Sequence, residues 1–178
     1  MKIYKILNNL IALSFTVIWS LQKKRTDFMI TCRVAKTEDT KELGRLLNKL
    51  FTQEAEFMPD EAAQERGLRK IISDENIGEI FVAQKDGKIV AMVNILYTIS
   101  TALGAKVAIL EDMIVDERHR GQDIGSTLME FALKCIKVKG CMRVTLLSDS
   151  DNFKAHEFYE KQGFVKSTMT PFRKVMDK

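Results

Sequence analysis

The chain has 178 residues, of which 46% are hydrophobic and 29% are charged, so it is long enough for one domain with its own core and is ordinary for a globular protein. Its net charge of +4 arises within residues 1–28, where five basic side chains stand against Asp27, and the remaining residues are neutral overall. A basic nucleic-acid-binding face on the folded part is therefore not expected.

Residues 1–28 form an extension in which an apolar stretch from Leu10 to Leu21 lies between basic residues. Twelve residues are too few to cross a bilayer, which takes about 20, and no small-residue cleavage site follows them. Three interpretations stay open: an upstream extension or mis-assigned start, with Met29 as the true start; a membrane anchor; or a helix docked on the domain. Binding to a membrane is expected only if the anchor is real.

Three cysteines, Cys32, Cys135 and Cys141, follow no CxxC or Cys/His spacing. This argues against a disulfide framework and a zinc site, and it favours a reducing, cytoplasmic location.

From Met29 onward, hydrophobic periodicity predicts one α/β domain over residues 29–178 with the order βααβββαβαββ. A strand at 30–36 precedes helices at 37–51 and 60–73. Strands at 79–84 and 88–100 flank Asp86-Gly87, a hairpin turn signal. A strand at 106–115, a helix after a glycine-containing bend, a strand at 142–148, a helix at 152–162 and strands at 164–170 and 172–176 complete the order.

The bend "RGQDIG", residues 120–125, lies between a strand and a helix. Unpaired N–H groups of a first helical turn, together with the helix dipole, favour an anion there. The bend is not a Walker loop, since no Lys-Ser/Thr pair follows, and its G-x-x-x-G spacing is not a dinucleotide fingerprint. Taken alone, it is equally typical of a structural strand–helix turn.

Three motifs in order extend this reading. "RGQDIGST" resembles the Q/R-x-x-G-x-G/A signature of the GNAT superfamily of acyl-CoA-dependent N-acetyltransferases, "LEDMIVDERHRG" resembles its central strand, and "NFKAHEFYEKQGF" resembles its later helix. The resemblance covers Met29 to the C-terminus. It implies a mixed, mostly antiparallel central sheet flanked by helices, and transfer of an acetyl group from acetyl-CoA, as cosubstrate, to a primary amine of a small molecule or peptide.

The resemblance also implies how acetyl-CoA would be held. Backbone amides of the bend would meet the pyrophosphate without a metal, and the central strand would pair with the pantetheine arm. The positions carried over are Met113, Ile114, Val115, Arg120, Gly121, Gln122, Asp123, Ile124, Gly125, Ser126 and Asn152. Asn152 is equally well explained as a helix N-cap.

Asp123 stands where the family usually has a glycine, which is the one departure in the signature. Two physical accounts are open. Aspartate is among the few residues that tolerate a positive φ, and its carboxylate can cap the following helix while the backbone N–H faces the ligand.

Glu111 and Asp112 interrupt an otherwise apolar strand, and burying an unpaired carboxylate is costly, so one of them is expected to face a wet cleft. There it would serve as the general base that deprotonates the attacking ammonium. Glu111 is the first choice because alternation puts it on the face of Met113 and Val115, and Asp112 is the second. The alternative is a structural ion pair with an arginine or lysine.

Tyr159 corresponds to the tyrosine that, in many members of the family, protonates the departing CoA thiolate. The alternative is that its ring packs the helix onto the sheet.

The resemblance places the acceptor pocket near residues 51–64. There, Glu54 and Glu56 with Phe57 and Met58 would favour a cationic amine beside an apolar group, or would form a solvated acidic loop.

No cysteine occupies a motif position, so direct attack in a ternary complex is expected rather than a covalent acyl-enzyme. The alternative function is a binding module that holds acyl-CoA without turnover, as a sensor or partner subunit. A homodimer is possible, and no nucleic-acid partner is expected.

Overall fold

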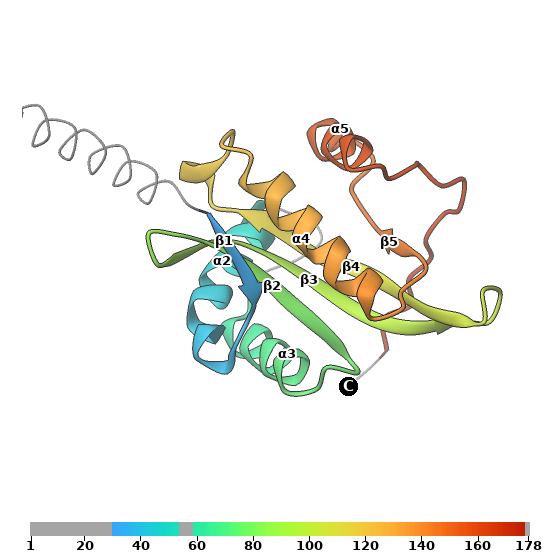
Figure 1. Ribbon diagram of the computed structural model, residues 1–178, viewed down its shortest axis with the longest axis horizontal. Coiled ribbons are helices and arrows are strands. Elements are labelled where there is room, and N and C mark those ends of the chain that lie inside the picture. Colours follow the sequence, from blue (N-terminus) through green and yellow to red (C-terminus); the bar gives the residue numbers. More distant parts are fainter. Residues whose placement is uncertain (1–29, 54–58, 177–178) are drawn as a thin grey trace, which may run out of the picture.

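The computed structural model describes residues 30–53 and 59–176. In chain order, the elements are β1 (Thr31–Val34), a short 3-10 helix (Thr37–Asp39), α2 (Thr40–Gln53), α3 (Glu61–Ser73), β2 (Gly78–Lys85), β3 (Lys88–Ser100), β4 (Ala105–Val115), a second 3-10 turn (Glu117–His119), α4 (Ile124–Val138), β5 (Val144–Leu146) and α5 (Phe153–Lys161) (Figure 1).

The strands form a five-stranded sheet in the order β1-β2-β3-β4-β5. The first four pair antiparallel, and β5 runs parallel to β4. Figure 1 shows α4 on one face of the sheet and α2 with α3 on the other, while β5 leads away to α5. The expected α/β class and mostly antiparallel sheet are confirmed.

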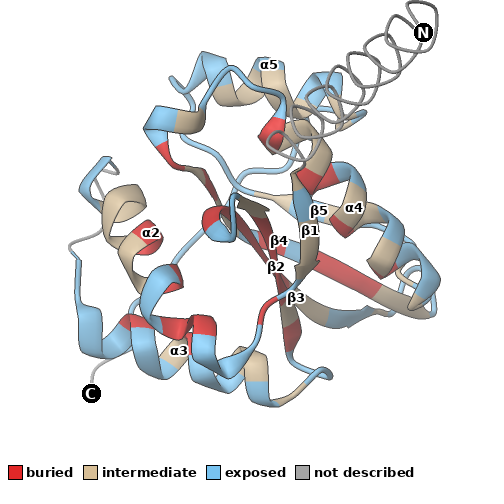
Figure 2. Ribbon diagram, turned by 60° about the vertical axis from the view of Figure 1, so that its left-hand side comes forward, coloured by how far each residue is buried: buried red, intermediate tan, exposed pale blue. Residues whose placement is uncertain are grey.

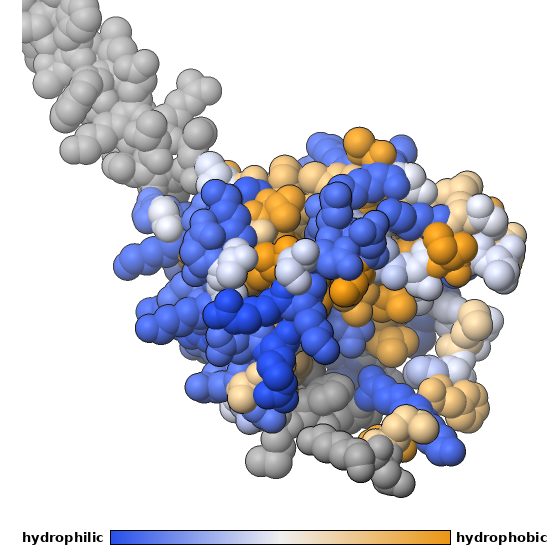
Figure 3. Space-filling model, turned by 90° about the horizontal axis from the view of Figure 1, so that it is seen from below, coloured by the Kyte–Doolittle hydropathy of each residue, from blue (hydrophilic) through white to orange (hydrophobic). Residues whose placement is uncertain are grey.

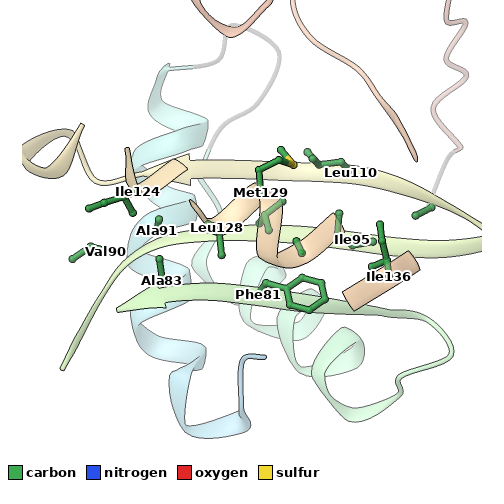
Figure 4. Packing of buried hydrophobic residues seen from close by; sticks show 13 residues of the cluster. Phe81, Ala83, Val90, Ala91, Ile95, Leu110, Ile124, Leu128, Met129 and Ile136 are labelled. Carbon is green, nitrogen blue, oxygen red and sulfur yellow. The ribbon is translucent and has the colours of Figure 1, made fainter. Parts of the chain in front are cut away.

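Strict alternation along β2 explains why the sheet is covered on both faces. Phe81 and Ala83 pack with α4, whereas Ile80 and Val82 pack with α2 and α3. Because successive side chains of a strand point to opposite faces, an apolar run must have a layer on each side. Buried residues accordingly lie along the strands and on the helix sides that face them (Figure 2), and Leu128 and Met129 of α4 pack on the strands together with Phe81 (Figure 4).

The Asp86-Gly87 turn behaves as the sequence predicts, and the structure adds a side-chain cap at the start of α3. Asp86 and Gly87 have φ values of 52° and 74°, both in the left-handed region that a two-residue hairpin of this type requires. The Asp60 carboxylate accepts a hydrogen bond of 3.0 Å from the Ala63 amide and caps α3.

The final pair of strands predicted at 164–170 and 172–176 is wrong, because neither stretch forms a strand. The strand predicted at 142–148 is shortened to β5. Val165, Phe172 and Val175 are at least nine-tenths exposed, so this segment has β-forming composition without the neighbouring strand that stabilises it.

Seen from below, hydrophobic residues gather at the centre and right of the molecule, and its left side is hydrophilic (Figure 3).

No helix among residues 30–53 and 59–176 is long and apolar enough to cross a membrane. The extension at 1–28 and the acidic stretch with Glu54, Glu56, Phe57 and Met58 lie outside the described residues.

Candidate active site

The C-terminal half of β4 has one open edge. β5 pairs with β4 only from Ala108 to Leu110, and no described strand pairs with that edge beyond Leu110. The Asp116 amide donates to Val90 of β3, while the Val115 carbonyl accepts from Arg120 on the other side. Since main-chain groups alternate between the two edges of a strand, those of Met113 and Val115 face the open edge. This edge can pair with an extended ligand.

A β-bulge separates the two carboxylates of this strand. Asn94 pairs with Asp112 and Ile95 with Leu110, so Glu111 is the additional residue and its side chain is exposed. Asp112 is largely enclosed, and its carboxylate accepts a 3.0 Å hydrogen bond from Asn94. No described lysine or arginine pairs with either carboxylate, so the ion-pair alternative finds no support in this part of the chain.

The Asp112 carboxyl lies in an environment that favours its neutral form. Burial raises its pKa, the neighbouring Glu111 adds to this, and the hydrogen bond from Asn94 opposes it. A carboxyl group with a raised pKa accepts a proton more readily at neutral pH, as a general base requires.

The bend before α4 has the backbone conformation of an anion-binding turn. Gly121 and Asp123 have φ values of 73° and 60°. The first helical hydrogen bond runs from Thr127 to the Asp123 carbonyl, so the amides of Ile124, Gly125 and Ser126 lie in the first turn without an intrahelical acceptor. Of the two accounts of Asp123, the positive φ is confirmed, and helix capping is wrong because its carboxylate makes no capping hydrogen bond.

The end of β4, the start of α4 and the more distant helix α5 meet at Gly125. A Cβ added there would lie 3.4 Å from Val115 Cγ2 and 3.5 Å from Phe158 Cε2. The open end of β4, the first turn of α4 and the helix α5 therefore surround one point, and the cofactor site expected there stays a prediction.

The two predicted residues of α5 have structural contacts of their own. The Asn152 side chain accepts a hydrogen bond of 3.2 Å from the Ala155 amide and caps the helix. The ring of Tyr159 packs edge-on against Phe158 and Phe164, with centroids 5.4 and 5.8 Å apart. The N-cap and packing interpretations are thus correct as descriptions of these contacts, and the catalytic and cofactor roles remain predictions.

Two side chains of the bend, Gln122 and Arg120, form hydrogen bonds to neighbouring elements. Gln122 accepts a hydrogen bond of 2.7 Å from Lys85 at the end of β2, and the Arg120 guanidinium donates to Val115 and to Gln53 of α2. Lys85 adds a cation beside the candidate anion site. Sequence reasoning missed it because it is adjacent to the bend only after the strands have paired.

Sequence reasoning also missed Asp116, the residue that connects the 3-10 turn Glu117–His119 to α2. It is 1% exposed and binds Arg45 at 2.9 Å, Lys49 at 3.2 Å and Arg118 at 3.3 Å. The hydrogen bonds from Arg118, Arg45 and Lys49 hold the pKa of this carboxyl far below its usual range, against the effect of burial. The sequence signal for Asp116 is weak: an acidic residue directly after an apolar strand, together with basic residues on α2.

Two hollows lie on the α2 side of β4. One, of about 290 Å³, is lined by α2 and the bend: Asn48, Lys49, Thr52, Gln53, Ile114, Glu117 and Arg120. The other, of about 320 Å³, lies between α2, α3 and the sheet, and Asp112 and Asn94 line it together with Gln64 of α3.

Replacement of Asp123 by glycine is expected to keep or tighten CoA binding, because glycine adopts the positive φ without strain and removes a negative charge near an anion. Calorimetric titration with CoA measures this. Asp123→Ala is the control and should lose roughly 1 kcal/mol of stability, since alanine resists this conformation. A tenfold loss of affinity in Asp123→Gly, about 1.4 kcal/mol, would show that the carboxylate has a positive role.

The mixed sheet, with an open edge of β4 beside a helix N-terminus, makes an α/β domain. Residues 40–164 match the model of the Acetyltransferase (GNAT) family. The chain belongs to this family.

Relatives and solved structures agree with this assignment. The chain is 26% identical to an aminoalkylphosphonate N-acetyltransferase of Salmonella typhimurium, over 83% of this chain and 94% of the relative. It is 32% identical to a glucosamine 6-phosphate N-acetyltransferase of Trypanosoma brucei brucei, over 49% of this chain and 58% of that protein. A possible acetyltransferase from Clostridium difficile has the same fold, with a TM-score of 0.76 at 18% identity over 84% of this chain and 99% of that one.

Proposed function

We propose that this chain transfers the acetyl group of acetyl-CoA directly to the primary amine of a small molecule. The observation that carries the proposal is that the open edge of β4 and the N-terminus of α4 meet at Gly125. The largely enclosed carboxylate of Asp112 lies on the same strand and lines the adjoining cavity. Acetyl-CoA supplies an activated thioester, and the protein supplies alignment, a base and an acid.

The cosubstrate would be held by main-chain groups. Along Met113, Ile114 and Val115, the main-chain groups of Met113 and the amide of Val115 face the open strand edge and would pair with the amide-containing pantetheine arm, whereas the Val115 carbonyl is held by Arg120. The amides from Gly121 to Ser126 offer donors for the pyrophosphate. Arg120, Gln122 and Asn152 border these elements.

Asp112 is the base in this proposal. Its carboxylate takes a proton from the ammonium of the acceptor, and the neutral amine forms a bond to the thioester carbon. A main-chain N–H of the β4 edge stabilises the resulting oxyanion. The C–S bond then breaks, and the thiolate takes a proton from Tyr159. The second proton on the adduct nitrogen restores the tyrosine hydroxyl through water, and Asp112 returns its proton to solvent. Glu111 remains the second candidate for the base.

Replacement of Tyr159 by phenylalanine tests the acid. It removes only the hydroxyl and keeps the ring contacts with Phe158 and Phe164, so we expect kcat to fall at least roughly tenfold with little change in KM for acetyl-CoA. Steady-state kinetics at saturating acetyl-CoA measures this. Unchanged kcat would leave Tyr159 with a packing role alone.

The proposal as a whole is tested by release of free thiol from acetyl-CoA over a panel of amino sugars, polyamines, amino alcohols, amino acids, aminoglycosides and peptides. Thermal shift with CoA is measured in parallel. Acetylation of at least one amine supports the enzyme. Stabilisation by CoA without turnover of any amine would favour an acyl-CoA-binding module, and the absence of both would overturn the proposal.

A further inference from the structure

Two residues that line the cavity between α2, α3 and the sheet carry buried polar atoms without a hydrogen-bond partner among the described residues. Gln64 is 8% exposed and Asn94 is 4% exposed. Among the described residues, neither Oε1 nor Nε2 of Gln64 has a hydrogen-bond partner, and neither has Oδ1 of Asn94. Buried polar groups are normally paired because leaving them unpaired is costly. These groups are therefore suited to a ligand that brings both donors and acceptors.

The ionisable residues that line this cavity are acidic. Asp60 and Asp112 line it, and no described lysine or arginine does. The sequence between Gln53 and Pro59 contains no basic residue either. Lys49 lines the neighbouring hollow, and its ammonium is bound to Asp116 and Glu117 at 3.2 and 3.6 Å. An anionic ligand would lose its hydration here without gaining a counter-charge, whereas a cationic amine would be stabilised.

The remaining walls are apolar and come from the two helices. Leu47 and Phe51 of α2 and Leu68 and Ile71 of α3 line the cavity. These side chains would pack against the short carbon skeleton of a ligand. Gln64, Asn94 and Asp112 line the same cavity and would pair with its polar groups.

The resemblance already places the acceptor pocket in this region, and we propose that the acceptor which enters this cavity is a hydroxylated primary amine, an amino alcohol or amino sugar, without a phosphate or carboxylate group. The inference rests on the proposed acetyl transfer and names its substrate class. The ammonium faces Asp112, and a hydroxyl group pairs with the free amide of Gln64 and with Asn94 Oδ1. The phosphonate and phosphate acceptors named for the two relatives do not suit this lining.

Matched acceptors test the class with acetyl-CoA as donor. Glucosamine is compared with glucosamine 6-phosphate, and 3-aminopropan-1-ol with 3-aminopropylphosphonate. We expect kcat/KM to be at least tenfold higher for the member without the anionic group. Equal values, or preference for the phosphorylated member, would overturn the inference. Binding of acetyl-CoA without acetylation of either pair would also overturn it, and absence of acetyl-CoA binding would remove the proposed function itself.

Gln64→Leu tests whether the side-chain amide of Gln64 contacts the acceptor. We expect KM for glucosamine to rise at least tenfold while KM for acetyl-CoA is unchanged, and Tm to stay equal or rise, because leucine leaves no unpaired buried group. Arg66→Leu, on an exposed position of the same helix, is the control and should change neither KM. If Gln64→Leu does not fold, Gln64→Met, which is closer in shape, repeats the measurement. Unchanged KM for the acceptor in a folded variant contradicts a contact with Gln64.

Discussion

Asp112→Asn is expected to lower kcat by a factor of roughly 10² to 10⁴, the usual contribution of a general base. The asparagine keeps the shape of the side chain and its contact with Asn94 but cannot take a proton from the ammonium. KM for acetyl-CoA should change little, because the side chain lies in the cavity on the α2 side of β4 and the expected cosubstrate contacts are main-chain groups. Steady-state kinetics with one acetylated amine measures both parameters.

The pH profile separates a base from a merely structural carboxylate. Because the base must be deprotonated, kcat/KM of the wild type should rise with pH through the raised pKa of Asp112, and the acidic limb should lie above the range of an ordinary aspartate. In Asp112→Asn this limb should disappear, and only the titration of the amine substrate should remain.

Glu111→Gln is the matched control, since it changes the adjacent carboxyl group in the same isosteric way. Glu111 is the additional residue of the bulge and its side chain is exposed. Because this carboxylate lies outside the cavity, we expect a much smaller loss of kcat. A larger loss in Glu111→Gln than in Asp112→Asn would assign the base to Glu111.

The second large effect concerns stability. Asp116→Asn should lower the free energy of unfolding by about 2 to 3 kcal/mol at pH 7, since hydrogen bonds to charged groups contribute roughly 1.5 to 3 kcal/mol and the amide of asparagine would present donors to Arg45 and Lys49. The partly exposed cations recover some hydration, which keeps the loss below that of a fully buried pair. For a chain of this length, Tm should fall by roughly 4 to 12 °C.

The sign of the pH dependence follows from the lowered pKa of Asp116. A carboxyl whose folded pKa lies below its unfolded value stabilises the fold above the unfolded pKa, near 4, and loses this contribution as the pH falls toward the folded pKa. The difference in stability between wild type and Asp116→Asn should thus be full at pH 7 and shrink below about pH 4. Glu117→Gln is the control, because Glu117 is largely exposed and its contact with Lys49 is long. A similar loss in Glu117→Gln, or a difference that does not shrink in acid, would contradict this role of Asp116.

Most of the fold follows from local patterns. The alternation of apolar residues marks β2, β3 and β4, the helical spacing of Leu128, Met129 and Ala132 marks the buried face of α4, and the Asp86-Gly87 turn links β2 to β3. The predicted final strands failed because strand composition does not itself provide a neighbouring edge. β5 pairs with β4 over only three residues, and the segment after α5 stays exposed.

The sequence by itself determined the chemistry that the site can offer: a glycine-containing bend before a helix, two carboxylates in an apolar strand, and an aromatic helix after them. Only the tertiary structure decided which of these groups meet. At the bulge, Asp112 is largely enclosed and Glu111 is exposed. Asp116 binds cations from α2 and from the 3-10 turn that follows β4, and Gln64 of α3 lines a cavity beside the sheet. The physical reason is that backbone conformation and periodicity are local properties, whereas burial, pairing and desolvation arise only when segments far apart in the chain pack together.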